Sequence, residues 1–174
     1  MRPNFFIALR KLIVIALFWA GLAIYPAQVC STDKPLTVIT PSQLIGLWAQ
    51  VDEKNGKVQS LVRIVEVAPG LYEGTVEKLF PILGDNLNPR CEECQGDRKN
   101  QPVLGMRIIT GLRRTNGNAN SFDGGEILDP DSGDIYRLKI TILEAGKKLD
   151  VRGFIGISLF GRSQTWLRET LSTK

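Results

Sequence analysis

The chain of 174 residues contains no histidine, only two methionines and only three cysteines. Without histidine it has no Ser-His-Asp triad, no Cys-His dyad, no imidazole acid or base and no His-ligated metal. A G-x-S-x-G nucleophile elbow is also missing. These absences remove the most common catalytic arrangements, and we predict that the protein is not an enzyme and carries no cofactor or metal.

Long apolar runs are lacking except for one of 13 residues near the N-terminus, residues 12–24 (LIVIALFWAGLAI). Basic residues precede this run, and Pro26 follows it. This order is typical of a secretory signal peptide. A transmembrane anchor is the alternative, but it needs about 20 apolar residues to cross the hydrocarbon core. We therefore predict export, with cleavage after Ser31 or alternatively after Ala27.

Cleavage changes the electrostatic character of the chain. The whole sequence has 22 basic and 18 acidic residues, but three of the basic residues and none of the acidic ones precede residue 32. The formal charge of +4 therefore falls to +1 in the mature chain. Because no basic patch interleaved with aromatic residues accompanies this charge, we predict no nucleic-acid partner.

The predicted organisation follows from this division of the chain. We expect a cleaved signal peptide at 1–31, a polar leader at 32–41 and a single domain at 42–174. The mature protein is expected in the periplasm of a Gram-negative bacterium or outside the cell, with no stable membrane span after cleavage.

Amphipathic helical segments longer than one or two turns are also lacking, while β-branched and aromatic runs alternate with turn signals. Asn55-Gly56 is a strong hairpin signal, because both residues tolerate positive φ. The pattern predicts an all-β, eight-stranded antiparallel up-and-down barrel, with a two-sheet sandwich as the alternative. The expected strands cover residues 45–51, 58–67, 71–79, 103–112, 122–128, 135–143, 149–157 and 164–168.

Alternation assigns the faces of these strands. Residues 136, 138, 140 and 142 share an apolar face, and so do residues 72, 74 and 76. In the strand at 103–112, Leu104, Met106 and Ile108 are expected to oppose Arg107 and Ile109.

Eight strands enclose either a packed interior or room for one small ligand. Five residues are candidates for lining such a cavity, although the aromatic ones are equally compatible with an interior that holds no ligand. These candidates are Trp48, Tyr72, Met106, Tyr136 and Trp166.

Gly46-Leu47-Trp48 resembles the G-x-W of the first strand in lipocalins. That resemblance implies that an arginine of the last strand crosses the tryptophan and closes one end of the barrel, and Arg168 is the matching residue. Such a cation–π contact contributes about 0.5–2 kcal/mol.

Six motifs occur in order along most of the mature chain: Gly46-x-Trp48, Cys91-x-x-Cys94, QPVLG at 101–105, the glycine-rich segment 124–136, VRGFIG at 151–156 and GRSQTWLR at 161–168. With these motifs, about residues 42–169 resemble the bacterial domain-of-unknown-function family 2147. The resemblance implies an exported bacterial protein with a small lipocalin-like (calycin-like) β-barrel, and it implies no established activity.

Cys91 and Cys94 remain as a pair once Cys30 leaves with the signal peptide. Export favours a local disulfide between them. Redox activity is disfavoured because Glu92 and Glu93 lie between the sulfurs, and zinc is disfavoured because four ligands are needed. Intermolecular pairing is the remaining alternative.

Three acidic residues lie close together in the loop 129–134. Calcium binding is one interpretation, but a twelve-residue loop ending in a glutamate is absent. A hairpin turn with Gly133 at positive φ explains the same residues.

The function predicted from these features is binding of a small apolar or amphiphilic ligand inside the barrel. The alternative is a structural or protein-interaction module of the cell envelope with a filled barrel. The two predictions differ in whether the interior contains a cavity.

Overall fold

The computed structural model describes residues 43–81, 84 and 86–170. These residues belong to a compact unit that spans Leu36–Lys174. The predicted signal peptide at 1–31, the polar leader at 32–41 and the start of the domain at residue 42 lie outside the described residues. Within the described ranges, no helix is both long enough and apolar enough to cross a membrane.

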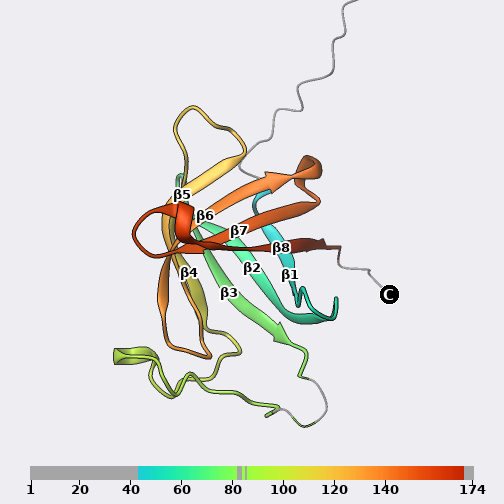
Figure 1. The fold of residues 1–174 in the computed structure, drawn as a ribbon, viewed down its shortest axis with the longest axis vertical. Coiled ribbons are helices and arrows are strands. Elements are labelled where there is room, and N and C mark those ends of the chain that lie inside the picture. The colour runs from blue at the N-terminus through green and yellow to red at the C-terminus, as the bar shows by residue number, and fades with distance from the viewer. Residues whose placement is uncertain (1–42, 82–83, 85, 171–174) are drawn as a thin grey trace, which may run out of the picture. The chain divides into compact units, whose positions relative to one another are not determined.

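Eight antiparallel strands form one closed barrel, and each strand pairs with its neighbours in chain order (Figure 1). The last strand returns to pair with the first, from Leu47 opposite Glu169 to Gln50 opposite Trp166. The predicted up-and-down barrel is therefore confirmed, and the sandwich alternative is wrong. The strands are β1 (Gly46–Val51), β2 (Val58–Ala68), β3 (Leu71–Leu79), β4 (Arg107–Arg114), β5 (Ser121–Leu128), β6 (Ile135–Leu143), β7 (Lys148–Phe154) and β8 (Arg162–Glu169).

Three single helical turns lie in the described connections between strands: η2 (Gly96–Arg98), η3 (Glu144–Gly146) and η4 (Ser158–Phe160). Because the strands alternate in direction, the connections divide between the two ends of the barrel. We call the end that carries the β1–β2, β3–β4, β5–β6 and β7–β8 connections the open end. The opposite end, where the chain enters β1, is called the closed end.

The largest difference from the predicted strands concerns β4, which begins at Arg107 instead of residue 103. Thr75 of β3 lies opposite Arg107, and Gly74 lies opposite Ile109. Ile108 is therefore an extra residue in β4, which is the definition of a β-bulge.

This bulge changes which side chains of β4 are buried. Ile108 and Ile109 are 5% and 0% exposed, whereas Leu104 is 54% exposed. The predicted opposition of Ile108 to Ile109 is therefore wrong, because strict alternation does not hold across a bulge. Leu104 lies before β4 and does not share the buried face of Met106 and Ile108, whereas Arg107 is exposed opposite these two residues, as predicted. The predicted apolar faces of β3 and β6 are confirmed by their alternating burial.

Side chains fill the half of the barrel next to the closed end. Tyr72 and Phe122 meet there edge to face, with ring centroids 5.4 Å apart. A Cβ at Gly74 would lie 2.9 Å from Cδ1 of Ile109, so the glycine leaves the space that the isoleucine occupies. Other fully buried residues of the interior are Trp48, Val62, Ile64, Leu112, Leu138, Ile140, Leu149 and Trp166.

Candidate ligand-binding site

The closed end is sealed by Arg168, whose guanidinium carbon lies 4.2 Å from the centroid of the Trp48 ring. The guanidinium donates hydrogen bonds to three backbone carbonyls, those of Gln43, Ile45 and Gly146. Burial lowers the pKa of this arginine from its ordinary value, but an arginine in a protein keeps its charge. One side chain thereby joins β8 to the chain entering β1 and to the β6–β7 connection.

The absence of a side chain at Gly46 leaves space for the guanidinium of Arg168. A Cβ at this position would lie 2.6 Å from Nη1 of Arg168, and the backbone has a φ of 147° that favours glycine. Two residues later, Trp48 is fully buried and donates its indole N–H to the carbonyl of Leu44 at 2.9 Å. The G-x-W pattern thus supplies a gap for the guanidinium and an aromatic face beneath it.

The open half of the barrel contains a cavity of about 990 Å³. Trp166 is fully buried and also lines the cavity, so it lies between the filled half and the hollow half. The volume reaches the upper part of the range for small-molecule sites. The barrel is therefore packed at one end and hollow at the other.

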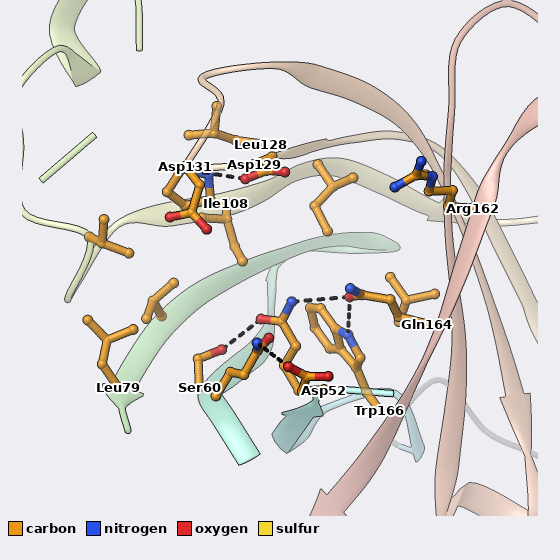
Figure 2. Close-up of a pocket in the computed structure, with 18 of the residues that line it drawn as sticks. Asp52, Ser60, Leu79, Ile108, Leu128, Asp129, Asp131, Arg162, Gln164 and Trp166 are labelled. Atoms are coloured by element: carbon orange, nitrogen blue, oxygen red, sulfur yellow. Dashed lines mark hydrogen bonds between the residues drawn. The ribbon is translucent and has the colours of Figure 1, made fainter. Parts of the chain in front are cut away.

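One wall of this cavity carries a chain of neutral, hydrogen-bonded side chains. Ser60 of β2 donates its hydroxyl to Oε1 of Gln50 at 2.9 Å. Nε2 of Gln50 donates to Oε1 of Gln164 at 3.1 Å, and the Trp166 indole N–H donates to the same oxygen at 3.4 Å. Figure 2 shows this chain of hydrogen bonds along one side of the cavity.

The facing wall is apolar, since Val76, Ile108, Ile127 and Leu128 line it. In Figure 2, Ile108 and Leu128 lie across the cavity from Ser60, Gln164 and Trp166. A molecule held between these walls would meet hydrogen-bonding groups on one side and hydrocarbon on the other.

Charged residues stand around the mouth of the cavity. In Figure 2, Asp129 and Asp131 lie together beside Leu128, and Arg162 lies apart from them above Gln164; Asp52 and Lys57 also line the cavity. Burial, followed by the nearby charge of Asp129, raises the pKa of Asp131. Asp52 accepts hydrogen bonds from the Lys54 backbone N–H at 2.7 Å and from two side-chain amides.

The five predicted lining residues lie in four different places in the structure. Tyr136 and Trp166 line the cavity. Trp48 lies under Arg168 at the closed end, and Tyr72 packs on Phe122 in the filled half. Met106 borders a separate, shallow hollow of about 570 Å³ beside η2.

Three polar lining residues, Gln50, Ser60 and Gln164, are not among the sequence-based candidates. Gln50 and Gln164 each lie two positions from an inward-facing tryptophan, Trp48 and Trp166. Because strand side chains alternate, residues two apart share a face, so spacing was a usable signal for both glutamines. Ser60 carries no such signal, because a serine in a strand is ordinarily a surface residue.

The acidic loop between β5 and β6 is a hairpin turn, as predicted. The Gly133 backbone N–H donates to the Asp129 carbonyl at 2.8 Å, and Gly133 has a φ of 71°. In the part of the chain that the structure describes, no group of three or more Cys, Asp or Glu residues is arranged to hold a metal ion.

Cys91 and Cys94 form a disulfide in the β3–β4 connection, with Cα atoms 5.3 Å apart. Both are buried, at 0% and 1% exposure. The Cys91 backbone N–H donates to the Gln101 carbonyl at 3.0 Å, so the bridge belongs to a locally ordered loop. Of the four interpretations of this pair, the structure matches the local disulfide.

Reduction of this disulfide is expected to have a modest effect. Closing so short a loop removes little chain entropy, so reduction should lower the free energy of unfolding by about 2 kcal/mol or less. Chemical denaturation with and without reductant measures this difference. The double variant Cys91→Ala and Cys94→Ala is the control, because reductant should not change its stability. Complete thiol labelling of the native exported protein without reductant would contradict the bridge.

An up-and-down barrel of eight strands, sealed at one end by G-x-W and a crossing arginine and hollow at the other, defines a lipocalin-like protein. The chain belongs to a bacterial family described as "Uncharacterized protein conserved in bacteria (DUF2147)", whose model matches residues 46–168. The resemblance stated from the sequence is thereby confirmed.

A solved structure is similar to this chain: "Protein HP1028 from the human pathogen Helicobacter pylori belongs to the lipocalin family". The TM-score is 0.60 at 16% sequence identity, and the match covers 74% of this chain and 84% of that one. This likeness shows the fold. Among curated proteins, none matches the chain significantly.

Proposed function

We propose that this protein binds one small, partly apolar molecule in the open half of its barrel and catalyses no reaction. The observation that carries the proposal is the cavity of about 990 Å³ with a polar wall facing an apolar wall. A protein that needed only a stable interior would gain by filling this space, since unfilled apolar volume costs stability. The absence of histidine from the chain also favours binding over catalysis.

We also propose that the protein acts outside the cytoplasm, in the periplasm or beyond the cell. The signal-peptide pattern of residues 1–31 supports this location. The disulfide between Cys91 and Cys94 supports it as well, because such bonds persist in oxidising compartments.

The test uses the neutral amphiphile N-phenyl-1-naphthylamine and isothermal titration calorimetry. We expect saturable binding at one site per chain. Gln164→Trp should lower the affinity at least tenfold, because the new ring on β8 would occupy the cavity. A tenfold lower affinity corresponds to about 1.4 kcal/mol of binding free energy.

The matched control is Thr165→Trp, which places the same ring on the outer face of the same strand. This variant should bind within about twofold of the parent protein. Thermal melting by circular dichroism shows whether both variants stay folded. A lack of saturable binding by the folded parent, or equal binding by both variants, would contradict the proposal.

The second candidate function is a protein-interaction module, and one surface favours it. Four large apolar side chains of the β7–β8 connection, Ile155, Ile157, Leu159 and Phe160, are between 60% and 78% exposed. Exposed apolar clusters of this kind mark contact surfaces. Failure of every ligand titration with a folded protein would leave this function as the better one.

A further inference from the structure

We infer that the cavity selects amphiphiles whose polar end is an oxyanion, in the first place a carboxylate, bound against β8 by Gln164 and Arg162. The inference rests on the proposed function and specifies the chemistry of its ligand. It follows from the direction of the hydrogen bonds in the polar wall and from the free charge above them.

The indole of Trp166 sets the direction of these hydrogen bonds. An indole N–H only donates, so the Gln164 atom that faces it must be the oxygen. That oxygen also receives the amide N–H of Gln50. Gln50 consequently presents its own oxygen to Ser60, whose hydroxyl donates to it.

This order leaves donors, and few acceptors, for a ligand. The amide oxygens of Gln50 and Gln164 are both engaged. Within the described part of the chain, Nε2 of Gln164 has no hydrogen-bond acceptor, and its two protons are available. A ligand that meets this wall must therefore offer acceptor atoms, because two donors facing each other leave both unsatisfied.

Arg162 adds a positive charge directly above these donors. It lies two positions before Gln164 on β8, so both side chains share the inner face, and both line the cavity. No ion pair engages Arg162 within residues 43–81, 84 and 86–170. A guanidinium has five N–H donors and no acceptor, and it binds carboxylates through paired hydrogen bonds.

The opposite wall would contact the apolar part of the ligand. Val76, Ile108 and Ile127 offer only hydrocarbon to the cavity. Asp129 and Asp131 in the β5–β6 turn, and Asp52 after β1, would repel an anion bound beside them (Figure 2). The oxyanion therefore lies along β8 and the apolar body lies against β3, β4 and β5.

Three probes with the same twelve-carbon chain test the inference: dodecanoate, dodecan-1-ol and dodecylamine, each titrated calorimetrically at neutral pH below its micelle concentration. Dodecanoate should bind at least tenfold more tightly than the alcohol or the amine, as expected for charge-assisted hydrogen bonds. Equal or tighter binding of the alcohol or the amine would overturn the inference.

Arg162→Met should lower the affinity for dodecanoate about tenfold, because the ion pair with the carboxylate is lost. The affinity for dodecan-1-ol, which forms no ion pair, should stay within about twofold. Gln164→Leu should also reduce the preference for dodecanoate over dodecan-1-ol. The control Lys139→Met removes a positive charge from the outer face of β6 and should change neither affinity. An unchanged ratio of dodecanoate to dodecan-1-ol affinity in Arg162→Met would refute the role of Arg162.

The two proposals fail in different ways. If all three probes bind alike, the cavity binds amphiphiles without selecting the head group, so only the inference fails. If none of the probes and no N-phenyl-1-naphthylamine binds to the folded protein, the proposed function fails together with the inference.

Discussion

Replacing Arg168 by methionine is expected to lower the free energy of unfolding by about 3–5 kcal/mol. The substitution keeps most of the apolar stem but removes hydrogen bonds to the carbonyls of Gln43, Ile45 and Gly146. Hydrogen bonds that involve a charged partner contribute about 1.5–3 kcal/mol each, and the contact with the Trp48 ring adds about 0.5–2 kcal/mol. We expect less than the sum because water can reach some of the freed carbonyls.

Two further variants test whether the loss of stability is specific to the contacts of Arg168. Chemical denaturation measures the free energy of unfolding of each variant. Arg168→Lys should recover only a part of the loss, because a single ammonium cannot span three carbonyls as a guanidinium does. Arg63→Met removes an arginine that forms a partly exposed ion pair with Glu77, and it should cost about 1 kcal/mol or less. Similar losses for Arg168→Met and Arg63→Met would show that the closed end does not depend on Arg168.

Gly133→Ala is expected to destabilise the protein by about 3 kcal/mol or more. Gly133 has a φ of 71°, where a side chain costs about 1–2 kcal/mol. A Cβ there would also overlap the Glu93 carbonyl and lie 2.8 Å from the backbone nitrogen of Cys94. Neither backbone can move locally to make space for the methyl group. The alanine would therefore push the whole β5–β6 turn away from the disulfide loop and weaken their contact.

Gly56→Ala is the matched control for this experiment. Gly56 has nearly the same φ, 69°, but no atom lies within 4 Å of the place where its Cβ would be. This variant should lose only the conformational part, about 1–2 kcal/mol. The difference between the two variants in denaturant titrations measures the packing of the turn on the disulfide loop, and equal losses would mean that this packing contributes nothing.

Much of the fold could be read from the chain because strand faces and turns are local properties. Seven of the eight strands lie within about three residues of their predicted bounds, and the turns at Asn55-Gly56 and Asp129–Gly133 are where their residue types place them. The bulge at Ile108 was missed because apolar residues at 108 and 109 satisfy several registers equally well. Only pairing with Gly74 and Thr75 selects one of them.

The candidate site was less predictable than the fold. Large aromatic residues were chosen as lining candidates, but Trp48 and Tyr72 fill the closed half. The polar wall consists of Gln50, Ser60 and Gln164, from β1, β2 and β8. A glutamine or serine in a strand is read as a surface residue by default, because local sequence does not tell whether the inner face at that level is hollow.

By itself, the sequence determined eight alternating strands, the G-x-W with its distant arginine, and a pair of cysteines three residues apart. These features depend on backbone preference and on neighbours along the chain. Tertiary structure alone decided how far the barrel is filled, since each level of the interior combines side chains from strands far apart in sequence. It made the end at Trp48 and Arg168 solid and left the end at Gln164 and Arg162 hollow.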